Sequence, residues 1–335
     1  MADTVRVGLI GFGHAGRVFH APQITAIAGM ELAAIASSRE DEIHTAYPKA
    51  KVYADADSLL TDDSLDLVVI ATPNEAHAPL AIAALNAGKA VVVDKPFTVT
   101  CEEARAVMAT AQETGKLLSV FHNRRWDSDY LTLKAEVASG RLGKIVYFES
   151  HFDRYRPVPS GNWREQAVPA AGLWYDLGPH LIDQAVALFG RPQSIFADME
   201  IQRDGVAATD YFHVILRYGK TRVVLMASAL AAADDQRFVL HGTRASLTIS
   251  GADAAEAAKR PQKKVGTEAI RAEADGALTP VPLLADDRQA FYAGMRDAVL
   301  GHAPLPVTAD EAFTVMQVLA IAQKSVAESR EVPFA

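Results

Sequence analysis

A lysine stands at the end of a short apolar segment, between Asp94 and Pro96. The segment before it, Ala90 to Val93, has the composition of a buried β-strand. Doubly wound α/β sheets bind their ligands outside the carboxyl ends of the strands, so Lys95 would point toward such a crevice. An ammonium group there can donate a hydrogen bond to a substrate oxygen. The alternative is a loop lysine that only pairs with Asp94.

A glycine-rich stretch follows the first apolar segment, Val5 to Ile10, and opens a helical pattern. Its glycines permit a tight turn and let a pyrophosphate approach the backbone at the start of the helix. Because a strand precedes it and a helix follows, we interpret the stretch as part of a dinucleotide site rather than as a turn without a ligand. It matches G-x-G-x-x-G and reads Gly11, Phe12, Gly13, His14, Ala15 and Gly16.

The end of the second expected strand, Leu32 to Ala36, bears on which cofactor is bound. NAD-binding folds usually carry an acidic residue there, about 20 residues beyond the glycines, which holds the ribose 2′-hydroxyl. This chain has Ser37, Ser38 and Arg39 instead, and a guanidinium with two hydroxyls suits a 2′-phosphate. We therefore predict NADP, with NAD less favoured. Ser38 could instead, or in addition, cap the next helix, with Asp41 completing a capping box.

Further cofactor contacts are expected where the fourth strand, Leu65 to Ala71, reaches the same edge of the sheet. Asn74 could also cap the following helix, and His77 could be a plain surface residue. Asp94 and Lys95 complete the predicted cofactor-binding set after the fifth strand. The residues that follow the fourth strand are Thr72, Pro73, Asn74 and His77.

Residues 1–122 alternate apolar strands with helical patterns. This alternation predicts an α/β domain with a parallel, doubly wound (Rossmann) sheet and right-handed crossovers. Thr100-Cys101-Glu102-Glu103 is a capping box that should open a helix ending near Gly115. Other strands are expected over 51–53 and 117–121, and another helix over 76–87.

Residues 123–335 should form a second, α+β domain with an open, mostly antiparallel sheet, because sequential strands follow one another by short connections. Residues 251–279 are rich in alanine, glycine and charge, and we interpret them as a solvated excursion with Lys259, Arg260, Lys263 and Lys264 on a wet surface. The expected strands are 145–152, 194–202, 211–218, 221–227, 238–241 and 246–249, and the expected helices are 129–139, 181–189, 288–300 and 309–327.

The composition excludes several classes of protein. The formal charge of −8 argues against a nucleic-acid partner. Cys101 is the single cysteine, which permits no internal disulfide and suits a reducing cytosol. The N-terminal residues lack the pattern of a signal peptide, and no apolar run has the length of a membrane span. We expect a cytoplasmic protein without a membrane partner, and a homodimer or homotetramer formed through the open second sheet.

A second group of chemically capable residues lies in the C-terminal half. Asp176, His180 and Asp183 recur at one-turn spacing and could share one side of a helix. Pro179 is tolerated only in a first turn, so His180 should lie near the helix start, where the helix dipole favours a neutral imidazole that can act as a base. The alternative is a capping aspartate and a packed histidine. No third ligand completes a metal site, and we predict no metal.

Together these motifs resemble the GFO/IDH/MocA oxidoreductases, the family of glucose-fructose oxidoreductase and inositol dehydrogenase, over nearly the whole chain. The family pattern is a glycine fingerprint, then E-K-P, then D-x-x-x-H at the opening of a helix, which here is Asp176 to His180. The resemblance implies that Lys95, Asp176 and His180 form the catalytic group and that the Lys95–Pro96 bond is cis. Asp94 departs from the pattern, because it replaces the usual glutamate.

Longer segments are similar to the NADP-dependent scyllo-inositol dehydrogenases of bacteria within this family. The resemblance implies hydride transfer between NADP(H) and a secondary alcohol of a cyclitol or sugar. His180 would be the base, Lys95 would donate to the reacting oxygen, and Asp176 would orient the substrate or the base. The segments are 122–127, 154–157, 163–165, 173–180 and 305–311.

Candidate walls of the substrate pocket, beside Asp176 and His180, are Asn123, Arg124, Tyr155 and Trp163. Arg124 and Arg125 could instead only pair with Asp127 or Asp129. Two other functions stay open at this point. One is a dehydrogenase for another polyol, an aldose or a sugar phosphate. The other is a non-enzymatic NADP-binding protein that senses redox state.

Overall fold

The computed structural model describes residues 4–232, 236–251 and 268–334. The chain divides into two compact units, Met1–Asn123 with Arg288–Met316, and Arg124–Asp287 with Gln317–Ala335. The first break lies next to the boundary expected from the sequence. The second differs, because residues 288–316 belong with the first unit rather than the second. The reason is packing: Phe291 stacks edge-on against Phe121 with ring centroids 5.0 Å apart, and the Ser119 hydroxyl donates to the carbonyl of Val307 at 2.7 Å.

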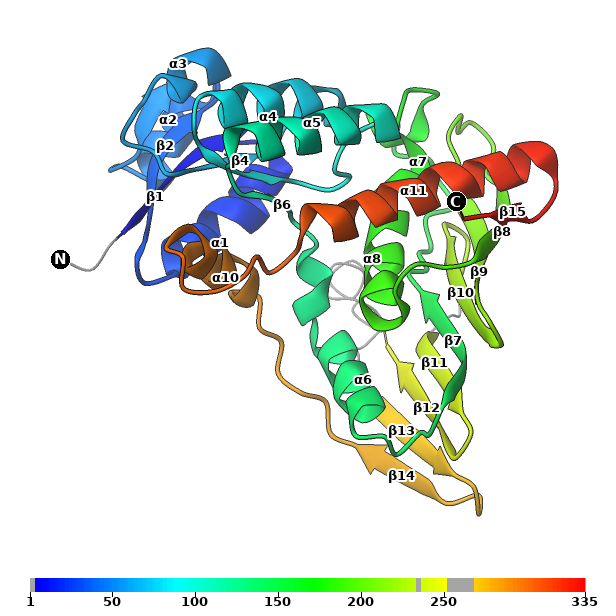
Figure 1. The fold of residues 1–335 in the computed structure, drawn as a ribbon. Helices are drawn as coiled ribbons and strands as arrows, with labels where there is room; N and C mark the ends of the chain where they lie inside the picture. The colour runs from blue at the N-terminus through cyan, green and yellow to red at the C-terminus, as the bar shows by residue number, and fades with distance from the viewer. Residues whose placement is uncertain (1–3, 233–235, 252–267, 335) are drawn as a thin grey trace. The chain divides into compact units, whose positions relative to one another are not determined.

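The first unit is built on a six-stranded parallel sheet with the strand order β3-β2-β1-β4-β5-β6, which confirms the predicted Rossmann sheet. Every residue of β4 and β5 is buried, as expected for strands covered on both faces. Figure 1 shows α4 and α5 on one side of this sheet and α1 on the other. The strands are β1 (Val5–Ile10), β2 (Met30–Ala36), β3 (Lys51–Tyr53), β4 (Leu67–Ile70), β5 (Ala90–Val93) and β6 (Leu118–Val120).

Most helices of the first unit begin and end near the residues expected from the sequence. The capping box is confirmed, because the Thr100 hydroxyl accepts from the backbone N–H of Glu103 at 3.1 Å and the Glu103 carboxylate accepts from that of Thr100 at 3.0 Å. The helix that follows the glycine loop opens as a π-helical turn, η1 (Gly16–His20). The α-helices are α1 (Ala21–Ala26), α2 (Glu40–Ala46), α3 (Ala56–Leu60), α4 (His77–Asn86), α5 (Cys101–Thr114) and α10 (Ala290–Val299).

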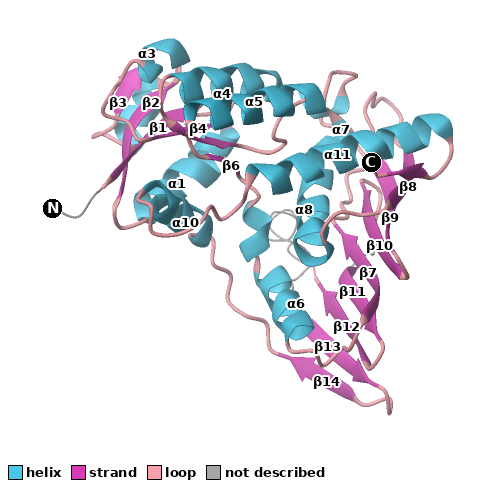
Figure 2. Ribbon diagram, in the orientation of Figure 1, coloured by secondary structure: helices cyan, strands magenta, loops and turns pink. Residues whose placement is uncertain are grey.

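The second unit contains a nine-stranded mixed sheet with the order β14-β13-β12-β11-β7-β10-β9-β8-β15 (Figure 2). Among the described strands of this sheet only β7 and β10 pair in parallel, so the expectation of a mostly antiparallel sheet is confirmed. Its strands are β7 (Ile145–His151), β8 (Ser194–Glu200), β9 (Tyr211–Tyr218), β10 (Thr221–Ser228), β11 (Gln236–Gly242), β12 (Ala245–Ser250), β13 (Glu268–Glu273), β14 (Leu278–Val281) and β15 (Val332–Pro333).

Helices of the second unit pack on this sheet through aromatic side chains. Tyr130 of α6 lies 6.4 Å, between ring centroids, from Phe238 of β11, and Phe189 of α8 lies 5.5 Å from Phe148 of β7. The helix α11 crosses the division between the units at residue 316. The helices are α6 (Ser128–Ala138), α7 (Gly172–Asp176), α8 (Gly178–Phe189) and α11 (Ala309–Glu328).

The interpretation of residues 251–279 as a solvated excursion is wrong for their second half. Residues from 268 onward form β13 and the start of β14, which extend the sheet beyond β12. Ala269 is buried, and Arg271 binds Glu136 at 2.9 Å and Glu273 at 2.6 Å. The strand β13 lies one strand from the sheet edge and is partly exposed, so it can carry the charged residues Glu268, Arg271 and Glu273. Lys259, Arg260, Lys263 and Lys264 lie outside the described residues.

None of the helices in the described ranges is both long enough and apolar enough to span a bilayer. Within the same ranges, no three histidine, cysteine or acidic side chains gather closely enough to hold a metal ion.

Candidate functional site

Each of the three fingerprint positions requires glycine for a different structural reason. Gly11 has a φ of +98°, and a Cβ there would lie 2.5 Å from the carbonyl oxygen of Ala71. A Cβ at Gly16 would collide with the carbonyl oxygen of Gly11. A Cβ at Gly13, in contrast, would meet nothing within 4 Å. The first and third glycines therefore permit close packing, and the second leaves open space beside the loop, as a bound pyrophosphate requires.

The side chains around this loop divide into core and surface. Phe12 is buried against Tyr47, so only its backbone can face a ligand, whereas His14 is exposed and lies edge-on to Phe19. The hydroxyl of Thr72 is buried and makes no hydrogen bond with any residue that the structure describes. An orphaned hydroxyl next to an open glycine loop fits a ligand with polar atoms, such as a dinucleotide.

At the end of β2, two arginines converge on one carboxylate. Arg39 binds Glu42 at 2.8 Å, and Arg17 of η1 binds the same side chain at 3.1 Å. The hydrogen bond from Arg39, together with the charges of both arginines, lowers the pKa of Glu42. A 2′-phosphate would compete with Glu42 for these two guanidinium groups. Arg17 was not predicted from the sequence, where its only signal is its position directly after Gly16.

The capping role considered for Ser38 is wrong. The residue that precedes α2 is Arg39, and no side chain caps this helix. Ser37 instead accepts a hydrogen bond from the backbone N–H of Arg39 at 3.3 Å, and Ser38 is exposed. Ser37 and Ser38 directly precede Arg39 in the sequence. Their contacts to a 2′-phosphate remain a prediction.

The carboxyl ends of β4 and β5 are tied together by a buried histidine. His77 lies with Nδ1 2.8 Å from the carbonyl oxygen of Pro96 and Nε2 3.1 Å from that of Thr72, so the alternative that it is a surface residue is wrong. Asn74 begins a 3-10 turn (Asn74–Ala76) after Pro73 rather than capping α4. The Lys95–Pro96 peptide bond is cis, as the family resemblance implied.

The carboxylate of Asp94 contacts the backbone of the next residue and the side chain of His20. Its Oδ1 accepts a hydrogen bond from the backbone N–H of Lys95 at 2.7 Å, and its Oδ2 lies 3.6 Å from Nε2 of His20. Burial raises the pKa of this carboxyl, but the contact with His20 and the positive charges nearby outweigh burial, so the pKa of Asp94 is lowered. His20 was missed by the sequence analysis, because a histidine inside an amphipathic helix gives no signal of its partner.

In the second unit the three polar residues at one-turn spacing do not belong to one helix. Asp176 is the last residue of α7, whereas His180 and Asp183 lie in α8. Pro179 is in the first turn of α8, so His180 lies near its start, as expected. Asp183 is 1 % exposed and is gripped by Arg125, with Nη2 2.7 Å from Oδ1 and Nε 2.9 Å from Oδ2. Asp183 therefore has a structural role.

Replacing Asp183 by asparagine should lower the free energy of unfolding by about 2–3 kcal/mol, because Arg125 would keep a buried charge without its counter-ion. Urea denaturation monitored by tryptophan fluorescence measures the effect. Glu328→Gln is the matched control, since it removes the more exposed ion pairs with Lys324 and Arg330 in the same unit and should change stability by less than about 1 kcal/mol. Equal small losses in both variants would contradict the assignment.

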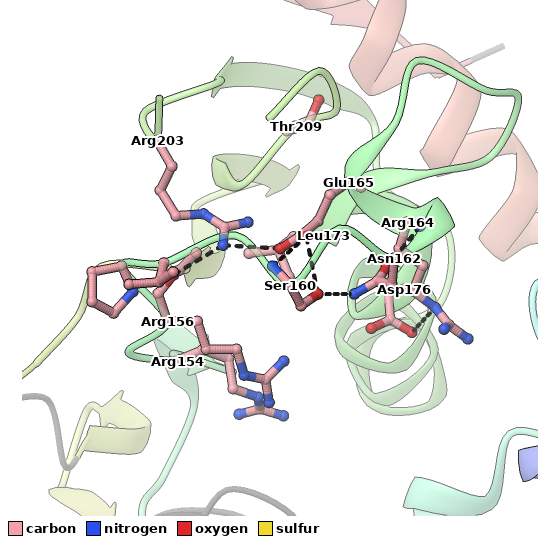
Figure 3. Close-up of a pocket in the computed structure, with 14 residues that line it drawn as sticks. Arg154, Arg156, Ser160, Asn162, Arg164, Glu165, Leu173, Asp176, Arg203 and Thr209 are labelled. Atoms are coloured by element: carbon pink, nitrogen blue, oxygen red, sulfur yellow. Dashed lines mark hydrogen bonds and ion pairs between the residues drawn. The ribbon is translucent and has the colours of Figure 1, made fainter. Parts of the chain in front are cut away.

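The second unit also contains a cavity of about 660 Å³ with Asp176 in its wall (Figure 3). Four arginines and two carboxylates face it, so its lining is basic although the chain as a whole is acidic. Arg164 reaches toward Asp176, with Nε 3.6 Å from Oδ1. The polar lining residues are Arg154, Arg156, Ser160, Asn162, Arg164, Glu165, Asp176, Arg203 and Thr209.

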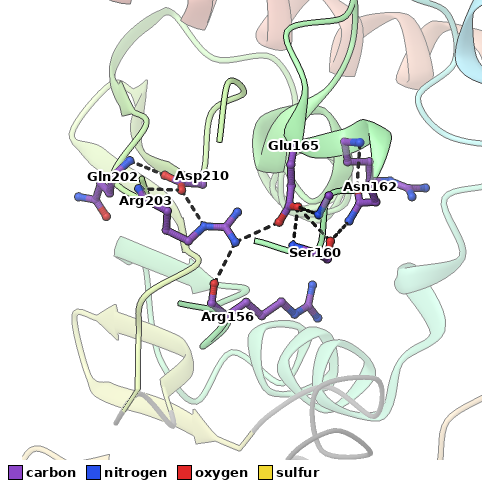
Figure 4. A network of polar contacts seen from close by, with 9 residues as sticks. Arg156, Ser160, Asn162, Glu165, Gln202, Arg203 and Asp210 are labelled. Atoms are coloured by element: carbon purple, nitrogen blue, oxygen red, sulfur yellow. Dashed lines mark hydrogen bonds and ion pairs between the residues drawn. The ribbon is translucent and has the colours of Figure 1, made fainter. Parts of the chain in front are cut away.

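A polar network fixes one wall of this cavity (Figure 4). Glu165 accepts hydrogen bonds from the backbone N–H groups of Ser160 and Gly161 at 2.7 and 2.8 Å, and Arg203 binds it at 3.1 Å. Arg203 is itself anchored by Asp210, with Nε 2.8 Å from Oδ2. These contacts tie the loop that carries Asn162 and Arg164 to Arg203 and Asp210.

Of the predicted substrate residues, only Asp176 lines the cavity. Tyr155 and Trp163 are about 40 % exposed and are not part of its wall. Arg124 binds Asp127 at 2.8 Å, which was the alternative considered for it.

His180 is buried, with its ring edge-on to Phe152 at 6.2 Å. Asn123 belongs to the first unit, as does Lys95, and is the last residue of its segment Met1–Asn123. Arg154, Arg156 and Arg164 were missed although they lie in segments that carried the family resemblance. Arg203 had no signal in the sequence.

These features define a protein with a dinucleotide-type Rossmann unit and a second α/β unit that carries a polar cavity. The family models for the oxidoreductase NAD-binding Rossmann fold and for the oxidoreductase C-terminal alpha/beta domain match residues 5–122 and 134–334. The chain belongs to the GFO/IDH/MocA oxidoreductase family and has an NAD(P)-binding Rossmann domain.

Its relatives include proteins with and without a described activity. The chain is 47 % identical to the uncharacterized oxidoreductase YdgJ of Escherichia coli strain K12, over 97 % of both chains. It is 34 % identical to the scyllo-inositol 2-dehydrogenase (NADP(+)) IolW of Bacillus subtilis strain 168, over 98 % of this chain and 96 % of that one. The structure of YPO2259 from Yersinia pestis is similar with a TM-score of 0.92 and 45 % identity, over 100 % of this chain and 98 % of that chain.

Proposed function

We propose that the chain is an NADP(H)-dependent dehydrogenase that interconverts a secondary alcohol and a ketone of a cyclitol or sugar, with scyllo-inositol as the first candidate. The observation that carries the proposal is the cavity around Asp176, whose volume and polar side chains suit a molecule with many hydroxyl groups. The name of the Bacillus relative, which states both scyllo-inositol and NADP, supports the same substrate class and cofactor.

Each proposed role belongs to a named side chain. The bound nicotinamide would supply a hydride acceptor or donor when the glycine loop holds the dinucleotide. His180 takes the proton of the reacting hydroxyl, because a neutral imidazole at a helix start is a suitable base. Lys95 donates a hydrogen bond to the oxygen on which negative charge develops. Asp176 accepts from a substrate hydroxyl and orients it.

The basic lining of the cavity favours a second candidate function, a dehydrogenase for an anionic polyol such as a sugar acid or a sugar phosphate. Arginine is the side chain that binds carboxylates and phosphates in a bidentate way. Four of them face a cavity with only two carboxylates in its lining. Neutral and anionic substrates are therefore to be tested side by side.

The decisive experiment mixes the protein with NADP⁺ and a panel of cyclitols, aldoses, sugar acids and sugar phosphates, and follows NADPH formation by absorbance. Turnover of scyllo-inositol supports the first candidate, and turnover restricted to anionic compounds supports the second. Cofactor binding without turnover of any compound, in either direction, would contradict both and favour a redox-sensing protein.

Replacing Arg39 by alanine should raise the dissociation constant for NADP(H) by about ten-fold or more, because a charge-assisted hydrogen bond to the 2′-phosphate is lost. NAD(H) lacks that phosphate and should be affected much less. Dissociation constants for NADPH and NADH from fluorescence titration measure the difference. Glu42→Gln should act in the opposite direction, since it removes the carboxylate that competes for Arg39 and Arg17.

The matched control for Arg39 is Arg105→Ala, which removes another exposed arginine that forms an i,i+3 pair in the same unit. It should leave both dissociation constants unchanged. A loss of equal size for NADPH and NADH in Arg39→Ala would remove the argument for a 2′-phosphate contact.

A further inference from the structure

A chain of three polar side chains, two of them fully buried, ends at Asp94, immediately before Lys95. Its members come from distant parts of the sequence: His20 from the π-helical turn η1, Asp94 from the end of β5, and Tyr292 from α10. All three belong to the first unit. His20 and Tyr292 are 0 % exposed, so water does not reach this chain from their side.

His20 links the other two residues. Its Nδ1 lies 2.5 Å from the hydroxyl oxygen of Tyr292, and its Nε2 lies 3.6 Å from Oδ2 of Asp94. The second carboxylate oxygen, Oδ1, accepts from the backbone N–H of Lys95 at 2.7 Å. A hydrogen bond from the tyrosine hydroxyl of α10, a longer 3.6 Å ion-pair contact and a hydrogen bond from the backbone of Lys95 therefore lie in series.

The surroundings determine where the protons of the chain lie. Burial, and after it the charge of Asp94, raises the pKa of Tyr292, so its hydroxyl stays protonated and can donate to Nδ1. An Nε2 without a proton would direct its lone pair at the Asp94 carboxylate, which is unfavourable. The arrangement that suits both neighbours has Nδ1 accepting from Tyr292 and a proton on Nε2 directed toward Asp94.

The Nε2 end of this chain is not satisfied by an ordinary hydrogen bond. A separation of 3.6 Å from Oδ2 is longer than a hydrogen bond, and Nε2 has no other hydrogen-bond partner in the part of the chain that the structure describes. Buried polar atoms left in this state are uncommon and call for a reason. Contacts of reacting groups are often long in the free protein and shorten when ligands bind.

We propose that Tyr292 and His20 are positioning residues for the reaction at Lys95: they hold the Asp94 carboxylate in one orientation, and Asp94 in turn holds the backbone of Lys95. The effect on catalysis rests on the proposed function, whereas the contacts among these residues do not depend on that function. It also gives Asp94, the position that departs from the family pattern, a role suited to a short side chain.

The charges around Asp94 agree with this role. Besides His20, the groups that act on it are Lys95 beside it, His77 from α4 and Tyr292 from α10. The contact with His20 contributes most to the lowering of the pKa of Asp94 against the effect of burial. Without His20 that pKa would rise, and Asp94 would be protonated at a higher pH.

Aromatic packing makes a mild test possible. The ring of Tyr292 lies 5.6 Å from that of Phe121 and 5.3 Å from that of Phe291, measured between centroids. Tyr292→Phe therefore keeps the ring packed and removes only the hydroxyl. His20→Gln is the second variant, because glutamine keeps an N–H donor that can face Asp94. His20→Leu removes that donor.

In the holoenzyme, Tyr292→Phe and His20→Leu should lower kcat by about ten-fold to a hundred-fold, because misplacement of a catalytic group by about an ångström can cost about a hundred-fold in rate. The KM for the polyol should change by less than about two-fold. In His20→Leu the acid limb of the kcat–pH profile should move to higher pH, and His20→Gln should restore part of kcat.

Tyr53→Phe is the matched control. It removes a tyrosine hydroxyl that donates to Asp62 at 2.8 Å in the same unit, but it lies in β3, four strands away from β5 in the sheet order. It should change neither kcat nor the pH profile.

A second measurement needs neither cofactor nor substrate. The backbone amide signal of Lys95 in the ¹H–¹⁵N spectrum of the full chain should shift in Tyr292→Phe and His20→Leu but not in Tyr53→Phe. A folded Tyr292→Phe with an unchanged Lys95 amide signal and an unchanged kcat overturns the inference. If the wild type turns over no compound of the panel, the proposed function is overturned, and the amide signal alone decides whether Lys95 is positioned by this chain.

Discussion

Replacing His180 by alanine is expected to lower kcat by about 10²- to 10⁴-fold, the range typical of a lost general base. The reacting hydroxyl must lose its proton as the ketone forms, and at neutral pH a neutral imidazole near a helix start can accept it. Binding of NADPH should change little, because the glycine loop proposed to hold the pyrophosphate does not include His180. Steady-state kinetics and a fluorescence titration with NADPH separate the two effects.

Two controls distinguish this role from simple packing, which matters because His180 is buried beside Phe152. Added imidazole should restore part of the activity of His180→Ala if the missing group is a base. His241→Ala removes an exposed histidine of the same unit and should have no effect on kcat. Near-normal turnover of His180→Ala would move the base assignment to Asp176, which lines the cavity.

The fold could be predicted because its signals are local. Buried parallel strands appear as uninterrupted apolar segments, and Thr100 with Glu103 marks a helix start within four residues. The strands β13 and β14 were missed because they lie at or next to the sheet edge, are partly exposed and lack a run of apolar residues, so their sequence resembles a loop. The assignment of residues 288–316 to the first unit was missed because it depends on a contact between Phe121 and Phe291, 170 residues apart.

The candidate site was predictable only in part, for a related physical reason. Residues at the carboxyl ends of strands, such as Thr72 and Lys95, are placed by the topology of a parallel sheet, so position in the sequence is enough. His20 and Tyr292 acquire their role from each other across 272 positions, and no local pattern reports such a pair. Arg203 likewise gains its place from Asp210 and Glu165.

Local spacing also misled in one case. Asp183 shares the one-turn spacing of Asp176 and His180, but Arg125 occupies its carboxylate. A spacing rule identifies residues that can lie on one side of a helix, and it does not show which partner each side chain meets. Tertiary contacts therefore decide which members of such a series are available for chemistry.

Lys95→Met is expected to lower kcat by about 10²- to 10³-fold, the loss found when one donor to a developing oxyanion is removed. Methionine keeps an unbranched chain of similar length and removes the ammonium group. Because that ammonium also helps to lower the pKa of Asp94, the pKa of Asp94 should rise in the variant and the acid limb of the pH profile should move to higher pH. Arginine is a poor substitute, since its planar fork cannot replace a compact charge.

The measurement for Lys95→Met combines kcat with the kinetic isotope effect for a substrate deuterated at the reacting carbon. Removing the donor slows the chemical step, so the isotope effect should reach its full size in the variant even if product release limits the wild type. Lys116→Met, which changes an exposed lysine of the same unit, should leave both quantities unchanged. If Lys95→Met kept normal turnover and an unchanged isotope effect, Lys95 would be a structural partner of Asp94, and the oxygen on which charge develops would need another donor.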